Sequence, residues 1–253
     1  MKFGPKKQKP SPPPTKSPTV PTPDGKITNR EPEIFQSHRK DDMPAEDALA
    51  QFLDQYLYAQ FPNKEAFHSI ERVFSKREQL DGIDVIFHAK DGRKFYVDVK
   101  AQLYYLNDDL PTFAFEIDSI QRGVLTTGWL CNPSLKTNMY LLVWPFASKS
   151  KPKGIRPEDF TKADCLLIQK RKLLRLLEYN GLSIERMLSD AAAIRREGRV
   201  GRVMIPGVEG MNYYASSPEK YAEAPINIVI KKYKLMSIKE RRYIVTPEKV
   251  EIE

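Results

Sequence analysis

The sequence has few of the residues on which disulfide-stabilised or zinc-stabilised domains depend. It contains two cysteines, Cys131 and Cys165, and three histidines among 253 residues. Two cysteines provide neither a disulfide framework nor a zinc ligand set, which is typical of a reducing compartment. His68 and His88 have no partner at metal-ligand spacing, so we interpret each as structural or exposed. These absences favour a cytoplasmic protein.

Long hydrophobic runs are also missing. No segment approaches the roughly 18 consecutive apolar residues that a membrane-spanning helix needs. The N-terminus lacks the apolar centre of a signal peptide. The composition, 41% hydrophobic and 29% charged, suits one globular domain of moderate size with a tail. We therefore expect no membrane association.

The N-terminal segment, residues 1–32, is rich in proline and lysine. Half of the 20 prolines in the chain precede Ala45. A stretch such as PSPPPTKSPTVPTP cannot form a core, so we expect a disordered or polyproline-like arm before a domain spanning residues 33–253. The arm is basic, and so is the whole chain, with a formal net charge of +8. A basic balance favours a polyanionic partner.

The most informative stretch is GIDVIFHAKDGRKFYVDVKAQ, residues 82–102. Apolar residues dominate 82–88 and 94–101, and Asp91-Gly92 between them is a strong hairpin signal. Because side chains alternate along a strand, Tyr96, Asp98, Lys100 and Gln102 would share one face. The sequence therefore predicts a hairpin with charged residues on one face of its second strand.

The turn decides whether Asp84 lies beside Asp98. A two-residue turn would pair Asp84 with Val99 and leave it on the wrong face. A three-residue loop, residues 90–92 with Gly92 in the left-handed conformation, would pair Asp84 with Asp98. Two adjacent carboxylates repel unless a cation joins them, and Mg²⁺ or Mn²⁺ suits oxygen ligands. The alternative is a solvated strand face with a cross-strand ion pair.

This pattern resembles the PD-(D/E)XK nuclease superfamily, which has the restriction-endonuclease-like fold. Asp84 would be the first acid, Asp98-Val99-Lys100 the (D/E)-x-K, and Gln102 a glutamine often found two residues later. Ile83 replaces the proline of the family name. The resemblance covers about residues 45–146 and implies an α/β (α+β) fold, a mixed central sheet flanked by helices. A basic extension, residues 160–253, would follow.

The resemblance also implies roles for these residues. Asp84 and Asp98 would hold Mg²⁺ or Mn²⁺, with the Val99 carbonyl as a further ligand. Lys100 would orient or deprotonate the attacking water, or stabilise charge on the phosphorus, and Gln102 would position these groups. The family's first helix often supplies another acid, for which Glu46 is the candidate, with Glu71 and Glu78 as alternatives. Acids also favour the first turn of any helix because of its dipole.

Other segments give ordinary secondary-structure signals. Helical spacing predicts helices over 42–60, 171–179 and 183–197, the last with Ser183 as its N-cap. Apolar runs predict strands over 67–75, 112–119, 138–145 and 164–169. Glu116, Asp118 and Trp129 fall in or near these segments, and Trp129 would either stack on a base or be buried.

Basic residues of the second half are candidate nucleic-acid contacts. The set could track a phosphate backbone, although solvated helix faces explain each single residue equally well. Its members are Lys136, Lys170, Arg171, Lys172, Arg175, Arg195 and Arg196.

Three functions fit these patterns. The first is a metal-dependent nuclease acting on DNA, with RNA as the alternative substrate. The second is a non-catalytic nucleic-acid-binding module on the same fold, and the third is a protein-interaction domain that works through the proline-rich arm. The sequence leaves the cutting mode and the oligomeric state open.

Overall fold

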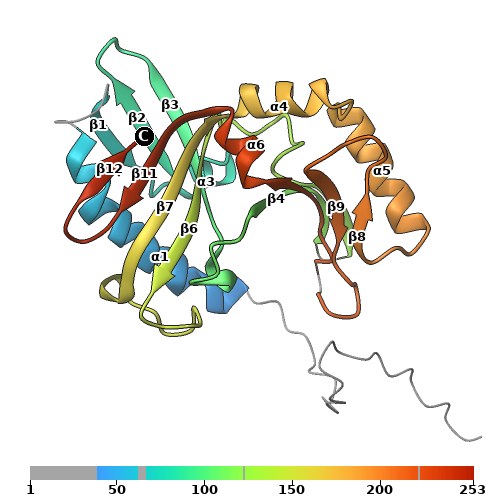
Figure 1. Ribbon diagram of the computed structural model, residues 1–253, viewed down its shortest axis with the longest axis horizontal. Helices are drawn as coiled ribbons and strands as arrows, with labels where there is room; N and C mark the ends of the chain where they lie inside the picture. Colours follow the sequence, from blue (N-terminus) through green and yellow to red (C-terminus); the bar gives the residue numbers. More distant parts are fainter. Residues whose placement is uncertain (1–38, 62–66, 122, 222) are drawn as a thin grey trace, which may run out of the picture. The chain divides into compact units, whose positions relative to one another are not determined.

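The computed structural model describes residues 39–61, 67–121, 123–221 and 223–253. The predicted N-terminal arm, residues 1–32, lies outside these ranges. The described chain has a mixed α+β fold with two β-sheets and few helices (Figure 1). None of its described helices is both long and apolar enough to cross a membrane. Cys131 and Cys165 are buried free thiols.

The larger sheet has seven strands in the order β1-β2-β3-β6-β7-β11-β12. The β3–β6 pair is parallel and the other five pairs are antiparallel. The parallel pair places the motif strand β3 beside the most buried strand, β6. The bounds are β1 (Phe67–Arg72), β2 (Val85–Ala89), β3 (Lys94–Ala101), β6 (Met139–Ala147), β7 (Phe160–Gln169), β11 (Lys239–Val245) and β12 (Val250–Ile252).

The smaller sheet has five antiparallel strands in the order β5-β4-β10-β9-β8. The expectation of one central sheet is therefore corrected, because the strand predicted at 112–119 belongs to this second sheet. The segment predicted as an extension, 160–253, contributes strands to both sheets. The bounds are β4 (Thr112–Gln121), β5 (Val124–Thr127), β8 (Gly201–Met204), β9 (Met211–Ala215) and β10 (Ile226–Lys231).

The three predicted helices are present with shifted ends, whereas the short helices α3 and α6 were not predicted. The helix expected at 42–60 begins earlier, ends at Tyr56 and continues as a short 3-10 turn. Ser183 caps its helix as predicted, since its Oγ accepts a hydrogen bond from the Arg186 N–H at 3.2 Å. The bounds are α1 (Arg39–Tyr56), η1 (Tyr58–Gln60), α3 (Lys76–Leu80), η2 (Leu103–Tyr105), η3 (Pro157–Asp159), α4 (Lys170–Tyr179), α5 (Ile184–Arg196) and α6 (Lys232–Met236).

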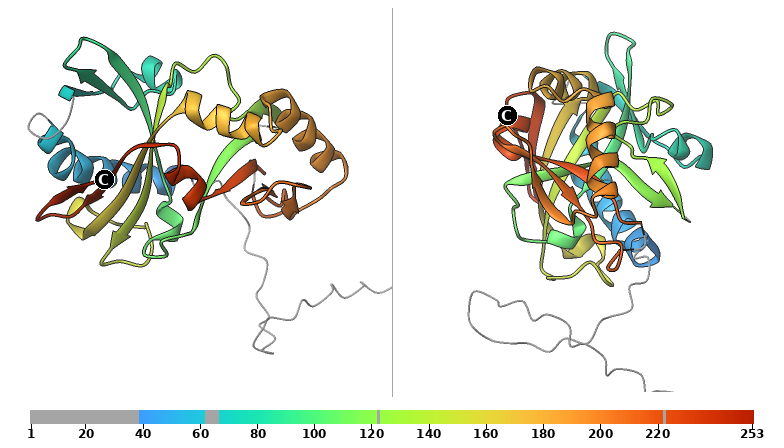
Figure 2. Two further views of the ribbon diagram at one scale, coloured as in Figure 1. Left: turned by 45° about the horizontal axis from the view of Figure 1, so that its top comes forward. Right: turned by 90° about the vertical axis from the view of Figure 1, so that its right-hand side faces the viewer.

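Two large hydrophobic cores fix this arrangement, and a third, small cluster of described residues contains Val73, Ile83 and Ile86. The first packs α1, through residues such as Leu49 and Phe52, against one face of the larger sheet. The second joins the opposite face to α4, α5 and the smaller sheet, and Trp144 and Phe115 lie within it. Figures 1 and 2 show α1 along the larger sheet and α5 beside the smaller one. β6 is buried because it lies between the two cores.

A buried ion network lies where β7, β11 and α6 meet. Asp164 is 4% exposed and accepts hydrogen bonds from Arg242 Nε and Nη2 at 2.9 and 3.0 Å. Lys232 Nζ is 2.8 Å from Asp164 Oδ2. Burial alone would raise the pKa of Asp164, but Arg242 and Lys232 hold it below its usual range. Because Lys232 directly follows β10, this network links the two sheets.

Candidate active site

The hairpin that carries the motif has the register that brings Asp84 toward Asp98. Val85 is opposite Val97 and His88 is opposite Lys94, so residues 90–92 form a three-residue loop. Gly92 has φ +84°, in the left-handed region, as predicted. The main-chain N–H of Asp84 donates to the Val97 carbonyl at 3.0 Å. The structure therefore confirms the predicted loop.

The Asp84 side chain takes the place of a strand partner at the edge of β3. β2 begins at Val85, opposite Val97. Beyond Val97, β3 pairs with β6 on one side but no longer with β2 on the other. Asp84 Oδ2 accepts a hydrogen bond from the Val99 N–H at 2.8 Å. The Gln102 N–H points the other way, to the Val143 carbonyl of β6. Since main-chain groups alternate along a strand, the Val99 carbonyl points toward the same edge as Asp84.

Asp98 is a buried carboxylate with one close cation. Its side chain is 3% exposed, and its Oδ1 lies 2.7 Å from Lys100 Nζ. Burial raises the pKa of Asp98 to about 6; Lys100 lowers it and the nearby Asp84 carboxylate raises it. One ammonium thus does not fully offset the combined effect of burial and a second acid.

Lys100 lies between these acids and the solvent. Its side chain is 32% exposed, and its Nζ is 5.3 Å from the centre of the Trp129 ring. Burial alone would lower the pKa of Lys100, but Asp98 and Asp84, with a smaller contribution from Glu46, raise it above its usual value. Lys100 is therefore a protonated ammonium in this arrangement.

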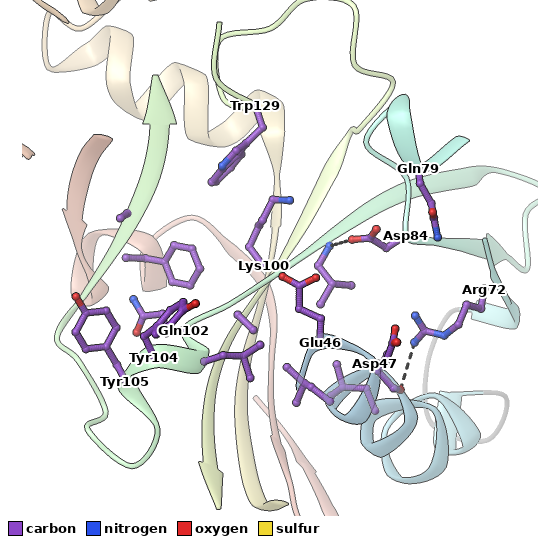
Figure 3. Close-up of a pocket in the computed structure, with 18 of the residues that line it drawn as sticks. Glu46, Asp47, Arg72, Gln79, Asp84, Lys100, Gln102, Tyr104, Tyr105 and Trp129 are labelled. Atoms are coloured by element: carbon purple, nitrogen blue, oxygen red, sulfur yellow. Dashed lines mark hydrogen bonds between the residues drawn. The ribbon is translucent and has the colours of Figure 1, made fainter. Parts of the chain in front are cut away.

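Asp84, Val99 and Lys100 border a cleft of about 590 Å³. Glu46 of α1, Asp84 and Lys100 project into the same space, with Trp129 on one side and Tyr104 and Tyr105 on another (Figure 3). Asp98 lies beneath Lys100 and does not line the cleft. Because this edge of β3 is open, Asp84 and Glu46 are accessible from the cleft.

Among the candidate accessory acids, Glu46 lies at the cleft. It is an exposed residue of α1 and contributes to the electrostatics of Lys100. Glu71 instead pairs with His88, with 3.1 Å between Oε2 and Nε2. Glu78 lies in the first turn of α3 and is not among the residues that line the cleft. The geometry favours Glu46 over both alternatives.

The two acids of β4 have different surroundings. Glu116 accepts a hydrogen bond from Ser119 at 3.3 Å, and burial raises its pKa although Lys100 acts in the opposite direction. Asp118 forms a buried ion pair with Arg195, which also donates to the Ala224 carbonyl at 2.9 Å. Asp118 therefore stabilises the fold, whereas Glu116 lies within electrostatic reach of the site.

Gln102 connects the motif strand to the smaller sheet. Its Nε2 donates to the Thr112 carbonyl at 2.9 Å. Its Oε1 is buried and accepts no hydrogen bond from the described residues. Gln102 lines the cleft and is hydrogen-bonded to the first residue of β4, while its positioning role stays a prediction.

The predicted nucleic-acid contacts are outside the cleft and differ in their surroundings. Arg195 is occupied by Asp118, so we reassign it to the stability of the fold. Lys136 pairs with Asp81 at 2.8 Å and Lys172 with Glu240 at 2.6 Å. Lys170 is half-buried, and burial lowers its pKa although Asp98 acts against this. The exposed members of the predicted set are Lys136, Arg171, Arg175 and Arg196.

Outside the hairpin and α1, Trp129 is the cleft residue that the sequence had indicated, and the others were not predicted. Tyr104 and Tyr105, two and three residues after Gln102, line the cleft, and Arg72 approaches it from β1. Two adjacent tyrosines just after a polar motif were the available signal, because exposed aromatic rings are common in nucleic-acid grooves. Arg72 gave no such signal, and it pairs with Asp54, with Nε donating to Oδ2 at 2.8 Å and Nη2 donating to Oδ1 at 2.6 Å.

The site fits a hard divalent cation with few protein ligands. Within the described ranges, no three His, Cys, Asp or Glu side chains gather as a ready metal site. Mg²⁺ commonly uses one or two carboxylates and retains several waters. The available oxygens here are Asp84, the incompletely neutralised Asp98 and the Val99 carbonyl, with Glu46 across the cleft.

Comparisons with protein-family models, curated proteins and solved structures find no match for this chain.

Proposed function

We propose that this protein is a metal-dependent nuclease that hydrolyses DNA phosphodiester bonds on a restriction-endonuclease-like fold. The observation that carries the proposal is the convergence of Asp84, Asp98 and Lys100 at the open edge of β3, beside a cleft. The hairpin, the parallel strand β6 and the covering helix α1 support the proposal, because the motif lies on neighbouring strands of a mixed sheet that α1 covers.

Asp84, Asp98 and the Val99 carbonyl would hold Mg²⁺ or Mn²⁺, and Glu46 would complete the set from α1. The ion would lower the pKa of a bound water and stabilise the charge that develops on the phosphoryl group. Its charge would also add to that of Lys100 in neutralising Asp98, whose pKa is raised to about 6.

Lys100 would act on the reacting groups directly. Its Nζ is a protonated donor at the floor of the cleft, 2.7 Å from Asp98 Oδ1. An ammonium there can donate hydrogen bonds to a water or to a phosphate oxygen and stabilise negative charge as it develops. Trp129 covers one side of the Nζ and limits its contact with bulk water.

The formal net charge of +8 favours a polyanionic substrate, and DNA is the substrate that we propose. Incubation with linear, circular, branched and single-stranded DNA tests the proposal. We expect cleavage of at least one substrate with Mg²⁺ or Mn²⁺ and none with EDTA. Absence of cleavage of every substrate with either metal would contradict the assignment.

A non-catalytic nucleic-acid-binding module is the second candidate, and one observation favours it. Lys100 already pairs with Asp98, and its pKa is raised by Asp84 as well, so the acids have a cation without a metal. In that case all DNA substrates would be bound and none cleaved. The third hypothesis concerns the proline-rich arm, which lies outside the described residues.

A further inference from the structure

Four exposed tyrosines lie on and beside the cleft. Tyr104 and Tyr105 of η2 are 53% and 52% exposed and line it. Tyr214 of β9 and Tyr221, which follows that strand, are each 46% exposed. Burial of large aromatic rings is a major source of stabilisation, so several half-exposed rings together on one surface call for an explanation.

The smaller sheet directs Tyr214 away from the helices. The neighbouring Tyr213 donates its hydroxyl to Asp190 of α5 at 2.9 Å, so Tyr213 faces α5. Side chains alternate along a strand, and Tyr214 therefore projects from the opposite face. Ala114 of β4 lies on that same face of the sheet and lines the cleft.

The strand register continues this face from the cleft to Tyr214. Ala114 is opposite Val229 in β10, and Val229 is opposite Asn212 in β9, two residues before Tyr214. Tyr214 and Tyr221 lie close enough to Tyr105 to raise its pKa, after the larger effect of burial. Tyr105, Tyr214 and Tyr221 thus form one group, which we call the tyrosine platform.

The charges around the platform distinguish a base from a phosphate. Asp108 lies near Tyr105 and contributes to raising its pKa, so a phosphate would be repelled there. A nucleobase presents a neutral ring, and base–aromatic stacking is a common mode of single-strand recognition. Arg202 is opposite Tyr214 in the sheet and is exposed, which places a cation beside the platform for the backbone.

We propose that the tyrosine platform stacks the unpaired bases of a DNA strand that enters the cleft, and that the substrate therefore contains a single-stranded segment. Bases inside a duplex are already stacked on each other and cannot present their faces to tyrosine rings. This inference rests on the proposed function of the cleft. The platform itself is tested by binding alone, without cleavage.

The test compares the full-length protein with a Tyr105→Ala/Tyr214→Ala variant in EDTA. The probes are a fluorescent single strand of about 20 nucleotides, the same strand with abasic sugars, and a duplex of equal length. We expect the double variant to bind the single strand at least about tenfold more weakly and the duplex within about twofold of wild type. The abasic strand should bind both proteins alike.

Two further variants separate stacking from surface damage. Tyr105→Phe/Tyr214→Phe keeps the rings and should bind the single strand like wild type. Tyr179→Ala removes a 91% exposed tyrosine at the end of α4 and should change nothing. If the Tyr105→Ala/Tyr214→Ala variant lost equal affinity for the single strand and the duplex, or lost none for the single strand, the stacking proposal would be overturned.

A different occupant would give a different result. If the tyrosines held the proline-rich arm, the alanine variant would leave single-strand affinity unchanged or increase it, which also overturns the inference. Metal-dependent cleavage of duplex DNA by the unmodified protein is measured separately. The nuclease proposal can therefore stand when the platform fails, and the platform can stand when cleavage is absent.

Discussion

Asp98→Asn is expected to abolish DNA cleavage while binding is retained or slightly strengthened. The substitution keeps the shape of a side chain that is 3% exposed but removes the charge that would hold the metal. Several kcal/mol of transition-state stabilisation from the metal correspond to a loss of about a thousandfold or more in rate. Binding persists because a negative charge near the phosphate is removed.

Asp91→Asn is the matched control. It is the same substitution in the same hairpin, at the exposed loop where Asp91 pairs with Arg93 at 2.7 Å. Single-turnover cleavage with Mg²⁺ and DNA binding in EDTA should be unchanged in this variant. Wild-type cleavage by Asp98→Asn, in a preparation free of contaminating nuclease, would remove Asp98 from the proposed machinery.

Asp164→Ala is expected to cost about 3–5 kcal/mol in the free energy of unfolding. The substitution removes the buried carboxylate shared by Lys232 and Arg242, and leaves them only the exposed acids Asp109 and Glu253. It also removes the link between β7 and the helix that follows β10. Urea denaturation of the wild-type and variant proteins measures this loss.

Glu158→Ala provides the comparison for an exposed pair. Glu158 lies 3.2 Å from Arg156, but the two side chains are 63% and 69% exposed. Solvent screening limits such pairs to about 0–1 kcal/mol, so this variant should unfold almost like wild type. Similar small losses in both variants would show that the Asp164 network does not hold the sheets together.

The hairpin could be predicted because local residues determine it. Asp91-Gly92 was compatible with a two-residue or a three-residue loop. The three-residue loop needs a residue in the left-handed conformation, which Gly92 adopts. The cap at Ser183 is equally local, since its Oγ bonds to a residue three positions later. Both features depend on contacts within a few residues of the chain.

The division into two sheets could not be predicted in this way. The alternation of apolar and polar residues in β4 would be the same in either sheet. Its partner β10 begins at Ile226, 105 residues after β4 ends at Gln121. Arg195 illustrates the same limit. Its neighbours suggested a basic surface, whereas its actual partner, Asp118, is 77 residues away in sequence.

Some of the residues at the cleft could be predicted from the sequence and others could not. The predicted acids and lysine lie close to one another, because both the hairpin register and the first helix could be predicted from local sequence. These residues are Asp84, Asp98, Lys100 and Glu46. Tyr214 reaches the same surface only through the register of β9 with β10 and β4. Long-range strand pairing therefore decides which residues surround the acids.

The central claim is that Asp84 and Asp98 share one divalent ion, and electron paramagnetic resonance of Mn²⁺ tests it most directly. We expect one bound ion per chain at pH 7. At pH 5 the affinity should be about tenfold weaker, because protons compete for Asp98, whose pKa is about 6. Asp98→Asn should lose the bound ion, and Asp91→Asn should keep it. Equal Mn²⁺ binding by wild type and Asp98→Asn, or no binding by wild type at pH 7, would contradict the account.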